Sequence, residues 1–279
     1  MIFKKTLLAG TTAALLSSAA MATPVTIGGI TWDPDALLDL TVTTALLQQA
    51  IAGNVGDVLF GIGKVAFING ASNFCTGCEL TYQFGGYTIT STTAPAAPTN
   101  FIFDGGWVNF YSDSTPDYDP NGEIATATDG LLWLTMNGHT DNEGNGAGTL
   151  FGQVDFFGSG GDDGDGSGLL DVGPGANLAS AGYVPGDLGY NPETGNVGAA
   201  NDYIATLERP DLIGGFADMN FSTEFAPIPS GNPTADGFQL TGSATFIGNS
   251  TAIPEPTSIA LLGLGLLGLA GLRRKNKAW

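Results

Sequence analysis

The interior of the chain alternates between short runs of apolar or β-branched residues and turns rich in Gly, Asn, Asp and Pro. Leu80, Tyr82 and Phe84 interleave with Thr81 and Gln83, which is the period-two pattern of a strand with one buried face. Similar runs predict strands over residues 58–68, 80–90, 100–111, 131–136, 149–157, 219–225 and 237–247. This arrangement predicts a mainly β body with an antiparallel β-sandwich or jelly-roll-like fold.

Two stretches depart from this pattern. Residues 33–52 open with Asp33-Pro34-Asp35 and are followed by Gly53, so an early Pro and a final Gly favour a helix. The β-branched residues at 41–44 fit a strand better, but we predict an N-terminal helix here. Residues 158–200 are dominated by Gly, Asp, Asn, Pro and Ala and predict a long loop.

Charge divides the chain into three parts. The full sequence has 8 Lys and Arg against 27 Asp and Glu, a net charge of −19. All 27 acids but only two of the cations fall within residues 23–256, which therefore carry a net charge of −25. Nucleic acid is excluded as a partner because neutralising phosphates requires clustered cations. A hydrophobic content of 43% is enough for a packed core, so the acidity does not imply disorder.

The N-terminal segment has the layout of a secretory signal. Lys4 and Lys5 precede an apolar run at 6–16, and Ala20-Met21-Ala22 supplies the small-residue pattern of a signal-peptidase site. We predict that residues 1–22 form a cleavable signal helix, handled by the Sec machinery and cut by signal peptidase before Thr23. The alternative is an ordinary N-terminal core helix.

The C-terminal segment has the layout of a membrane anchor. Residues 259–272 are an unbroken run of apolar residues and Gly that covers about 21 Å as a helix, against a hydrocarbon core of about 30 Å. Residues 256–258 make it barely long enough. Four cations follow and would hold this end in the cytoplasm: Arg273, Arg274, Lys275 and Lys277. We predict a C-terminal hydrophobic helix in the inner membrane; the alternative is a buried core helix.

A short motif precedes this run. Ile253-Pro254-Glu255-Pro256, followed by Thr-Ser, the Leu- and Gly-rich run and the Arg-Arg-Lys cluster, resembles the PEP-CTERM protein-sorting signal, although the family's usual Val is Ile253 here. The resemblance covers 253–279 and divides the chain into a signal peptide (1–22), an exported β-rich body (23–252) and a sorting signal (253–279). Tails of this kind are also described as the C-terminal domain of ice-binding proteins, which says nothing about the body.

This resemblance implies a route for the protein. Such a chain is exported by a Gram-negative bacterium, anchored transiently in the inner membrane and processed by an exosortase near Pro254, Glu255 and Pro256. It would then reach the outer surface or the extracellular polysaccharide matrix. In the body, the segment 74–87 (FCTGCELTYQFGGY) also resembles a stretch of uncharacterised exosortase-dependent surface proteins.

Cys75 and Cys78 are the only cysteines. Because an exported chain meets an oxidising compartment, we predict a disulfide between them. A redox or metal role is the alternative, but a thioredoxin-like site would need a βαβ context, and a zinc site would need more ligands than these cysteines and one distant His.

Acid-rich turns suggest calcium. Asp117, Asp119 and Asn121 occupy positions 1, 3 and 5 of a partial calcium loop, although Thr128 stands where the bidentate acid belongs. A second partial loop comprises Asp163, Asp165 and Asp171. Asp and Asn also serve turns through their own backbone hydrogen bonds, which is the alternative interpretation.

Motifs of catalysis are absent from the sequence, which has no G-x-S-x-G, H-E-x-x-H or phosphate-binding loop. We therefore predict an exported surface or matrix protein that is not an enzyme. Two alternatives remain: a secreted polysaccharide hydrolase with an unassigned carboxylate pair, and a calcium-dependent adhesin or carbohydrate-binding module.

Overall fold

The computed structural model describes residues 24–33, 40–50, 53–93, 99–119, 123–139, 149–154, 164–172, 209–210, 216–227 and 236–248. Within them the protein is mainly β, as predicted. The principal strands are β3 (Leu40–Ala50), β4 (Val58–Ile68), β5 (Glu79–Thr92), β6 (Thr99–Asp113), β7 (Leu131–Gly138), β8 (Leu150–Val154), β9 (Gly164–Val172), β12 (Met219–Pro227) and β13 (Leu240–Gly248). Two small hairpins pair β1 (Val25–Ile27) with β2 (Ile30–Trp32) and β10 (Arg209–Pro210) with β11 (Phe216–Ala217).

The short helix α2 (Ala125–Thr128) lies between β6 and β7. In the part of the chain that the structure describes, no helix has the length and apolar character needed to cross a membrane. The predicted signal helix and C-terminal hydrophobic helix both lie outside the described residues.

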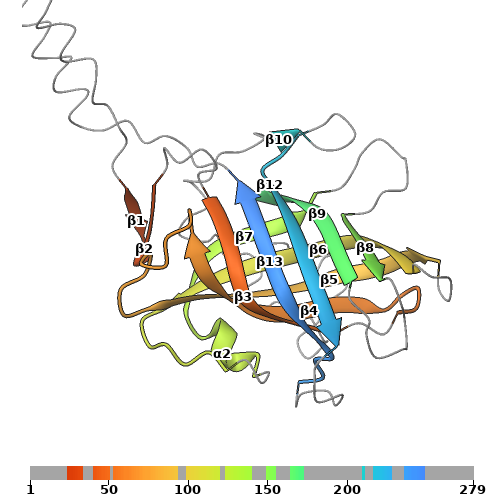
Figure 1. Cartoon of the computed structure of the whole chain (residues 1–279), viewed down its shortest axis with the longest axis horizontal. Helices are drawn as coiled ribbons and strands as arrows, with labels where there is room; N and C mark the ends of the chain where they lie inside the picture. Colours follow the sequence, from red (N-terminus) through yellow and green to blue (C-terminus); the bar gives the residue numbers. More distant parts are fainter. Residues whose placement is uncertain are drawn as a thin grey trace, which may run out of the picture. The chain divides into compact units, whose positions relative to one another are not determined.

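The nine principal strands form one antiparallel sheet that closes on itself. Its order is β12-β13-β3-β4-β5-β6-β7-β9-β8, and β12 also pairs with β9. β7 and β8 share one place in the ring, because β6 and β9 each pair with both of them. Most neighbours in the ring follow one another along the chain, and the ring is completed by pairing between its first strand, β3, and its last, β13. The connections therefore form a meander and not the crossovers of a jelly roll. In Figure 1, β3, β13 and β12 run across β4, β5 and β6, so two layers face each other as in a sandwich.

Aromatic side chains fill the space between the two layers. Tyr82 packs against Phe110 and Phe246 with ring centroids 5.2 and 5.4 Å apart, and all three residues are buried. Tyr82 and Phe110 come from the neighbouring strands β5 and β6, and Phe246 comes from β13, which is distant from both in sequence. The period-two alternation seen in β5 thus places one face of each strand in a common apolar core, whose burial drives folding.

The helix predicted over 33–52 is wrong, because Leu40–Ala50 forms strand β3. β3 pairs with β13 on one side and with β4 on the other. Its β-branched residues at 41–44 favour this conformation, and the two neighbouring ladders satisfy its backbone on both sides. Pairing with β4 and β13 therefore outweighs the helix-start and helix-end signals given by the early Pro and the final Gly of the segment.

Strand β9 lies within the stretch predicted as a long loop. Its composition is explained by close packing: a Cβ added at Gly168 would stand 2.5 Å from Cε1 of Phe221, and one added at Gly166 would stand 3.0 Å from Cγ2 of Thr223. The glycines thus leave room for side chains of the neighbouring strand β12. The rest of the predicted loop lies outside the described residues.

The β1–β2 hairpin packs onto the closed sheet. Trp32 meets Trp133 of β7 edge to face, with centroids 5.6 Å apart, and the Trp133 indole N–H donates to the Ile27 carbonyl at 2.9 Å. The Ser112 hydroxyl donates to the carbonyl of Gly28 at 2.6 Å. These contacts bury two aromatic side chains and fix the hairpin through its backbone.

The predicted disulfide between Cys75 and Cys78 is confirmed, with Cα atoms 5.4 Å apart. The turn that it closes includes Gly77, whose φ of +73° is in the region that favours glycine. Just before the turn, the Phe74 carbonyl accepts a hydrogen bond from the backbone N–H of Thr31 in β2. The disulfide therefore pins a turn that helps to hold the β1–β2 hairpin.

Candidate functional site

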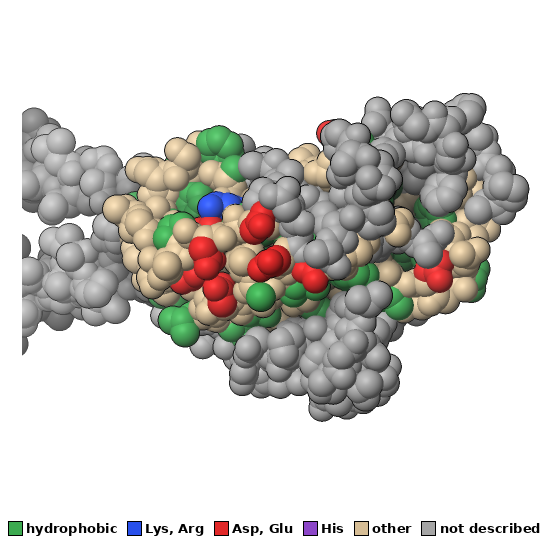
Figure 2. All heavy atoms as spheres, turned by 90° about the horizontal axis from the view of Figure 1, so that it is seen from below, with side chains coloured by type: hydrophobic (Ala, Val, Ile, Leu, Met, Phe, Trp, Pro, Cys, Tyr) green, Lys and Arg blue, Asp and Glu red, His purple; other side chains and the backbone are tan. Residues whose placement is uncertain are grey.

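An acidic cluster lies where β5 begins and β6 ends. Glu79 and Asp113 stand directly opposite each other in the antiparallel ladder. Asp117 follows β6 by a few residues, and one carboxylate oxygen from each of the three acids lies within 4.8 Å of the others. Figure 2 shows acidic side chains gathered on one face of the body beside a basic side chain. The cluster includes Asp117, the first residue of the predicted calcium loop.

Glu79 is the buried centre of this cluster, with a relative exposure of 2%. One of its oxygens forms an ion pair with Lys64 of β4. The other accepts hydrogen bonds from the backbone N–H groups of Asp117, at 2.8 Å, and Tyr118, at 2.9 Å. A buried carboxylate requires such partners, so Glu79 fixes the start of the segment that leads to α2.

Burial and the negative charges of the cluster raise the pKa values of two of its groups. The pKa of the Asp117 carboxyl is raised above its ordinary value by desolvation and by the negative charges of Asp129, Asp113 and Glu79. Burial, with Asp119 and Glu79 nearby, also raises the pKa of Tyr118. Three carboxylates facing one ammonium have the oxygen chemistry that calcium prefers. Calcium binding at Asp117 stays a prediction, and Lys64 already neutralises part of this charge.

The structure describes only part of the rest of the first predicted calcium loop. The backbone N–H of Asp119 donates to the Thr126 hydroxyl at 3.0 Å, which ties the segment to α2. Asn121 lies outside the described residues. The calcium-loop pattern does not include Glu79 and Asp113, and their register across the β5–β6 hairpin is the only sequence signal that could join them to Asp117.

The second predicted calcium loop is not a loop. Asp165 and Asp171 belong to strand β9, whose extended backbone cannot wrap an ion as a calcium loop does, and Asp163 lies outside the described residues. Asp171 instead accepts from Nδ1 of His139 at 2.9 Å. Burial raises the pKa of the Asp171 carboxyl, and the hydrogen bond from His139 lowers it. This pair joins the ends of β7 and β9.

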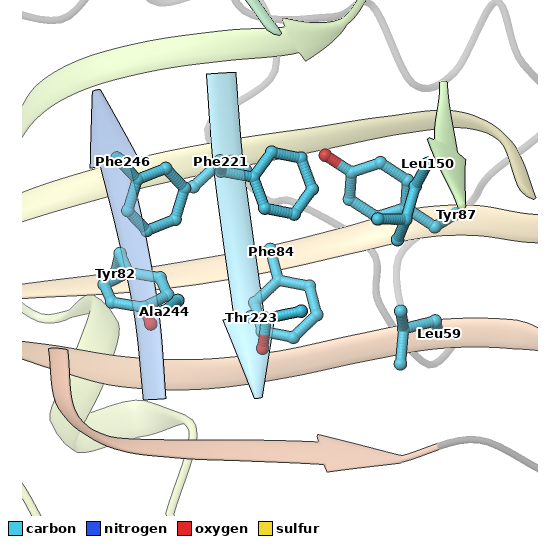
Figure 3. A pocket seen from close by; sticks show the side chains of 10 residues that line it. Leu59, Tyr82, Phe84, Tyr87, Leu150, Phe221, Thr223, Ala244 and Phe246 are labelled. Atoms are coloured by element: carbon cyan, nitrogen blue, oxygen red, sulfur yellow. The ribbon is translucent and has the colours of Figure 1, made fainter. Parts of the chain in front are cut away.

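The described residues enclose a small cavity in the interior of the sheet. It is lined by apolar and aromatic side chains, and the space open to the centre of a water molecule is about 20 Å³, enough for one water. In Figure 3 the side chains of Tyr87 and Phe221 point toward one another beside it. Tyr87 is 1% exposed, and its hydroxyl has no hydrogen-bond partner among the described residues. A cavity of this size cannot hold a cofactor or a substrate.

The similarity to known proteins lies in the C-terminal tail. A family model described as the PEP-CTERM protein-sorting motif matches residues 252–275. The chain carries a PEP-CTERM sorting motif at these residues. The match takes in the sorting residues Pro254, Glu255 and Pro256 and the first three cations of the basic stop, Arg273, Arg274 and Lys275; Lys277 lies just beyond it.

The PEP-CTERM sorting motif implies that the chain is sorted by an exosortase and exported through the envelope to the cell surface. The match does not reach the body, so the resemblance suggested for residues 74–87 has no support. Neither the curated proteins nor the solved structures include a match to this chain. The sorting residues lie outside the described part of the structure, and the signal peptide stays a prediction.

Proposed function

We propose that this PEP-CTERM protein is a non-enzymatic protein of the cell surface or extracellular matrix of a Gram-negative bacterium, acting through the outer surface of its β body. In this proposal the Sec machinery exports the chain, signal peptidase removes residues 1–22, and residues 259–272 hold it transiently in the inner membrane. Exosortase then cuts near Pro254-Glu255-Pro256 and releases the body. The observation that carries the proposal is the sorting-motif match at 252–275.

Two features of the body support a role without catalysis. The cavity that the described residues enclose within the sheet is too small for a substrate. The buried acid of the candidate site, Glu79, already accepts from Lys64 and from two backbone N–H groups, so its oxygens serve the fold. A catalytic carboxylate would instead need access to a proton of the substrate.

The sorting half is tested in the native host. A variant combining Pro254→Ala, Glu255→Gln and Pro256→Ala is expected to keep its tail and to accumulate, unprocessed, in the membrane fraction. Pro116→Ala, the same kind of change at an exposed position of the body, is the control and is expected to be processed normally. Immunoblots of fractionated cells report both size and location. Unchanged processing and distribution of the triple variant would contradict the proposal.

A further inference from the structure

The outer face of the sheet carries a groove over β8, β9, β12 and β13. Alternation along β12 explains its lining. Phe221 and Thr223 are buried, whereas Ser222 and Glu224, which alternate with them, are exposed. β9, β12 and β13 lie side by side in Figure 1, so small polar side chains of three strands meet on this outer face.

The groove is lined by side chains in register across the sheet. Phe151 of β8 stands opposite Ser167 of β9, Ser167 opposite Ser222 of β12, and Ser222 opposite Thr245 of β13. Neighbouring strands lie about 4.8 Å apart, so this row repeats at close to the length that one hexose unit occupies along a polysaccharide. A second row begins with Glu224 opposite Ser243.

The dimensions of the groove suit a ligand. Its volume is about 490 Å³, within the range of about 300 to 1,000 Å³ that is usual for ligand sites. Small side chains such as Ser167 and Ser243 leave the floor low, and Phe151, which is 44% exposed, stands at one end of the row. An exposed aromatic ring beside a row of hydroxyls offers one apolar contact and several polar ones.

The charge of the groove and the pairing of its strands limit the kind of ligand that it can bind. Among the described residues that line the groove there is no Lys or Arg and there is one acid, Glu224, so a polyanion would be repelled. Strand addition by a peptide requires an unpaired edge, but β12 has β13 on one side and β9 on the other. An apolar helix would find hydroxyls in place of an apolar floor.

An uncharged sugar chain matches each of these features. Ser and Thr hydroxyls both donate and accept hydrogen bonds, as sugar hydroxyls do. The Glu224 carboxylate can accept from two neighbouring sugar hydroxyls, and such charge-assisted bonds are the stronger ones. The ring of Phe151 can cover the apolar C–H face of a pyranose. We propose that this groove binds a segment of an uncharged polysaccharide.

The test uses the purified full chain, kept in solution with a polyoxyethylene detergent that has no sugar headgroup. Affinity electrophoresis is run in gels containing dextran, laminarin, galactomannan or hydroxyethylcellulose, with alginate as the anionic comparison. We expect retardation in at least one of the four neutral gels and none in alginate. Ser222→Ile, which fills the groove and removes a hydroxyl, is expected to weaken the retardation by about tenfold or more.

Ser91→Ile is the matched control, because Ser91 is an exposed serine of β5 that does not line the groove. It is expected to bind like the unmodified chain. Phe151→Ala and Glu224→Gln are each expected to weaken binding, so the test survives if Ser222→Ile fails to show the native near-ultraviolet circular dichroism. No retardation in any neutral gel, or equal retardation of the folded groove variants and the control, would overturn the proposal. Because the assay does not involve sorting, its failure leaves the proposed function standing.

Discussion

Replacing Tyr87 with Phe should stabilise the protein. The Tyr87 hydroxyl is buried and has no hydrogen-bond partner among the described residues, so folding removes it from water without replacement. Such a loss costs about 1–3 kcal/mol. Tyr87→Phe keeps the ring against Phe221, 6.2 Å away between centroids, and removes only the oxygen. We expect the free energy of unfolding to rise by about 1–2 kcal/mol and Tm by about 2–8 °C.

The measurement is chemical denaturation of the exported, processed protein, followed by tyrosine and tryptophan fluorescence. Tyr111→Phe is the matched control, because Tyr111 is equally buried but its hydroxyl accepts from the side-chain amide of Asn109. That variant is expected to lose about 0.5–1.5 kcal/mol. An unchanged or lowered midpoint for Tyr87→Phe would refute the reasoning, and would show that a water in the adjoining cavity completes the hydrogen bonding of Tyr87.

Comparing the unmodified protein with Tyr87→Phe gives a further test at alkaline pH. Burial raises the pKa of Tyr87 above its ordinary value of about 10. Above about pH 10 the Tyr87 hydroxyl therefore ionises in the unfolded state but stays neutral in the folded state. Ionisation then favours the unfolded state, so the free energy of unfolding is unaffected by this group below about pH 10 and falls as pH rises further. The unmodified protein should lose stability above about pH 10 more steeply than Tyr87→Phe, and parallel curves for the two proteins would count against a buried neutral Tyr87.

Three further predictions concern the neighbourhood of the acidic cluster. Lys64→Met should lower the free energy of unfolding by about 1–3 kcal/mol in urea denaturation, because it removes the cation from buried Glu79. The double variant Lys64→Met with Glu79→Gln should recover part of this loss, and an equal loss in both variants would argue against an uncompensated charge on Glu79. Reducing the disulfide between Cys75 and Cys78, which are three residues apart, should cost about 2 kcal/mol, measured by denaturation with and without dithiothreitol, and no change would mean that the turn needs no covalent link. The calcium prediction at Asp117 requires that millimolar calcium raises Tm and that Asp117→Asn removes the rise; a Tm equal in calcium and in EDTA would rule it out.

The strands that alternation predicts are those with one clearly apolar face. β4 has the predicted bounds, 58–68, and β5, β6 and β7 each extend the predicted run by one to three residues. β3 and β9 were not predictable in the same way, because their conformation depends on partners distant in sequence. The glycines of β9 are typical of a loop, and the packing of Phe221 on Gly168 and of Thr223 on Gly166 explains why the strand needs them.

The candidate site, too, could be predicted from the sequence only in part. Asp117 stands out in the sequence because turn residues surround it, but the pattern of a calcium loop joined it to Asn121 and not to Glu79. Pairing across the β5–β6 hairpin is what brings Glu79 and Asp113 to one place. In contrast, the sorting tail could be recognised fully from sequence, because its information lies in a contiguous run of residues.

Closure of the sheet has a consequence for the order of events during synthesis. β3 pairs with β13, and Thr43 and its partner Thr245 are 202 positions apart in the sequence. Contacts of such long range form slowly, and β13 is the last of the described strands that the ribosome makes. The body therefore remains an open chain until residue 248 has been made, and the sorting motif begins only a few residues later, at 252. The last strand and the sorting tail thus become available almost together, which favours recognition of the tail before the body has finished folding.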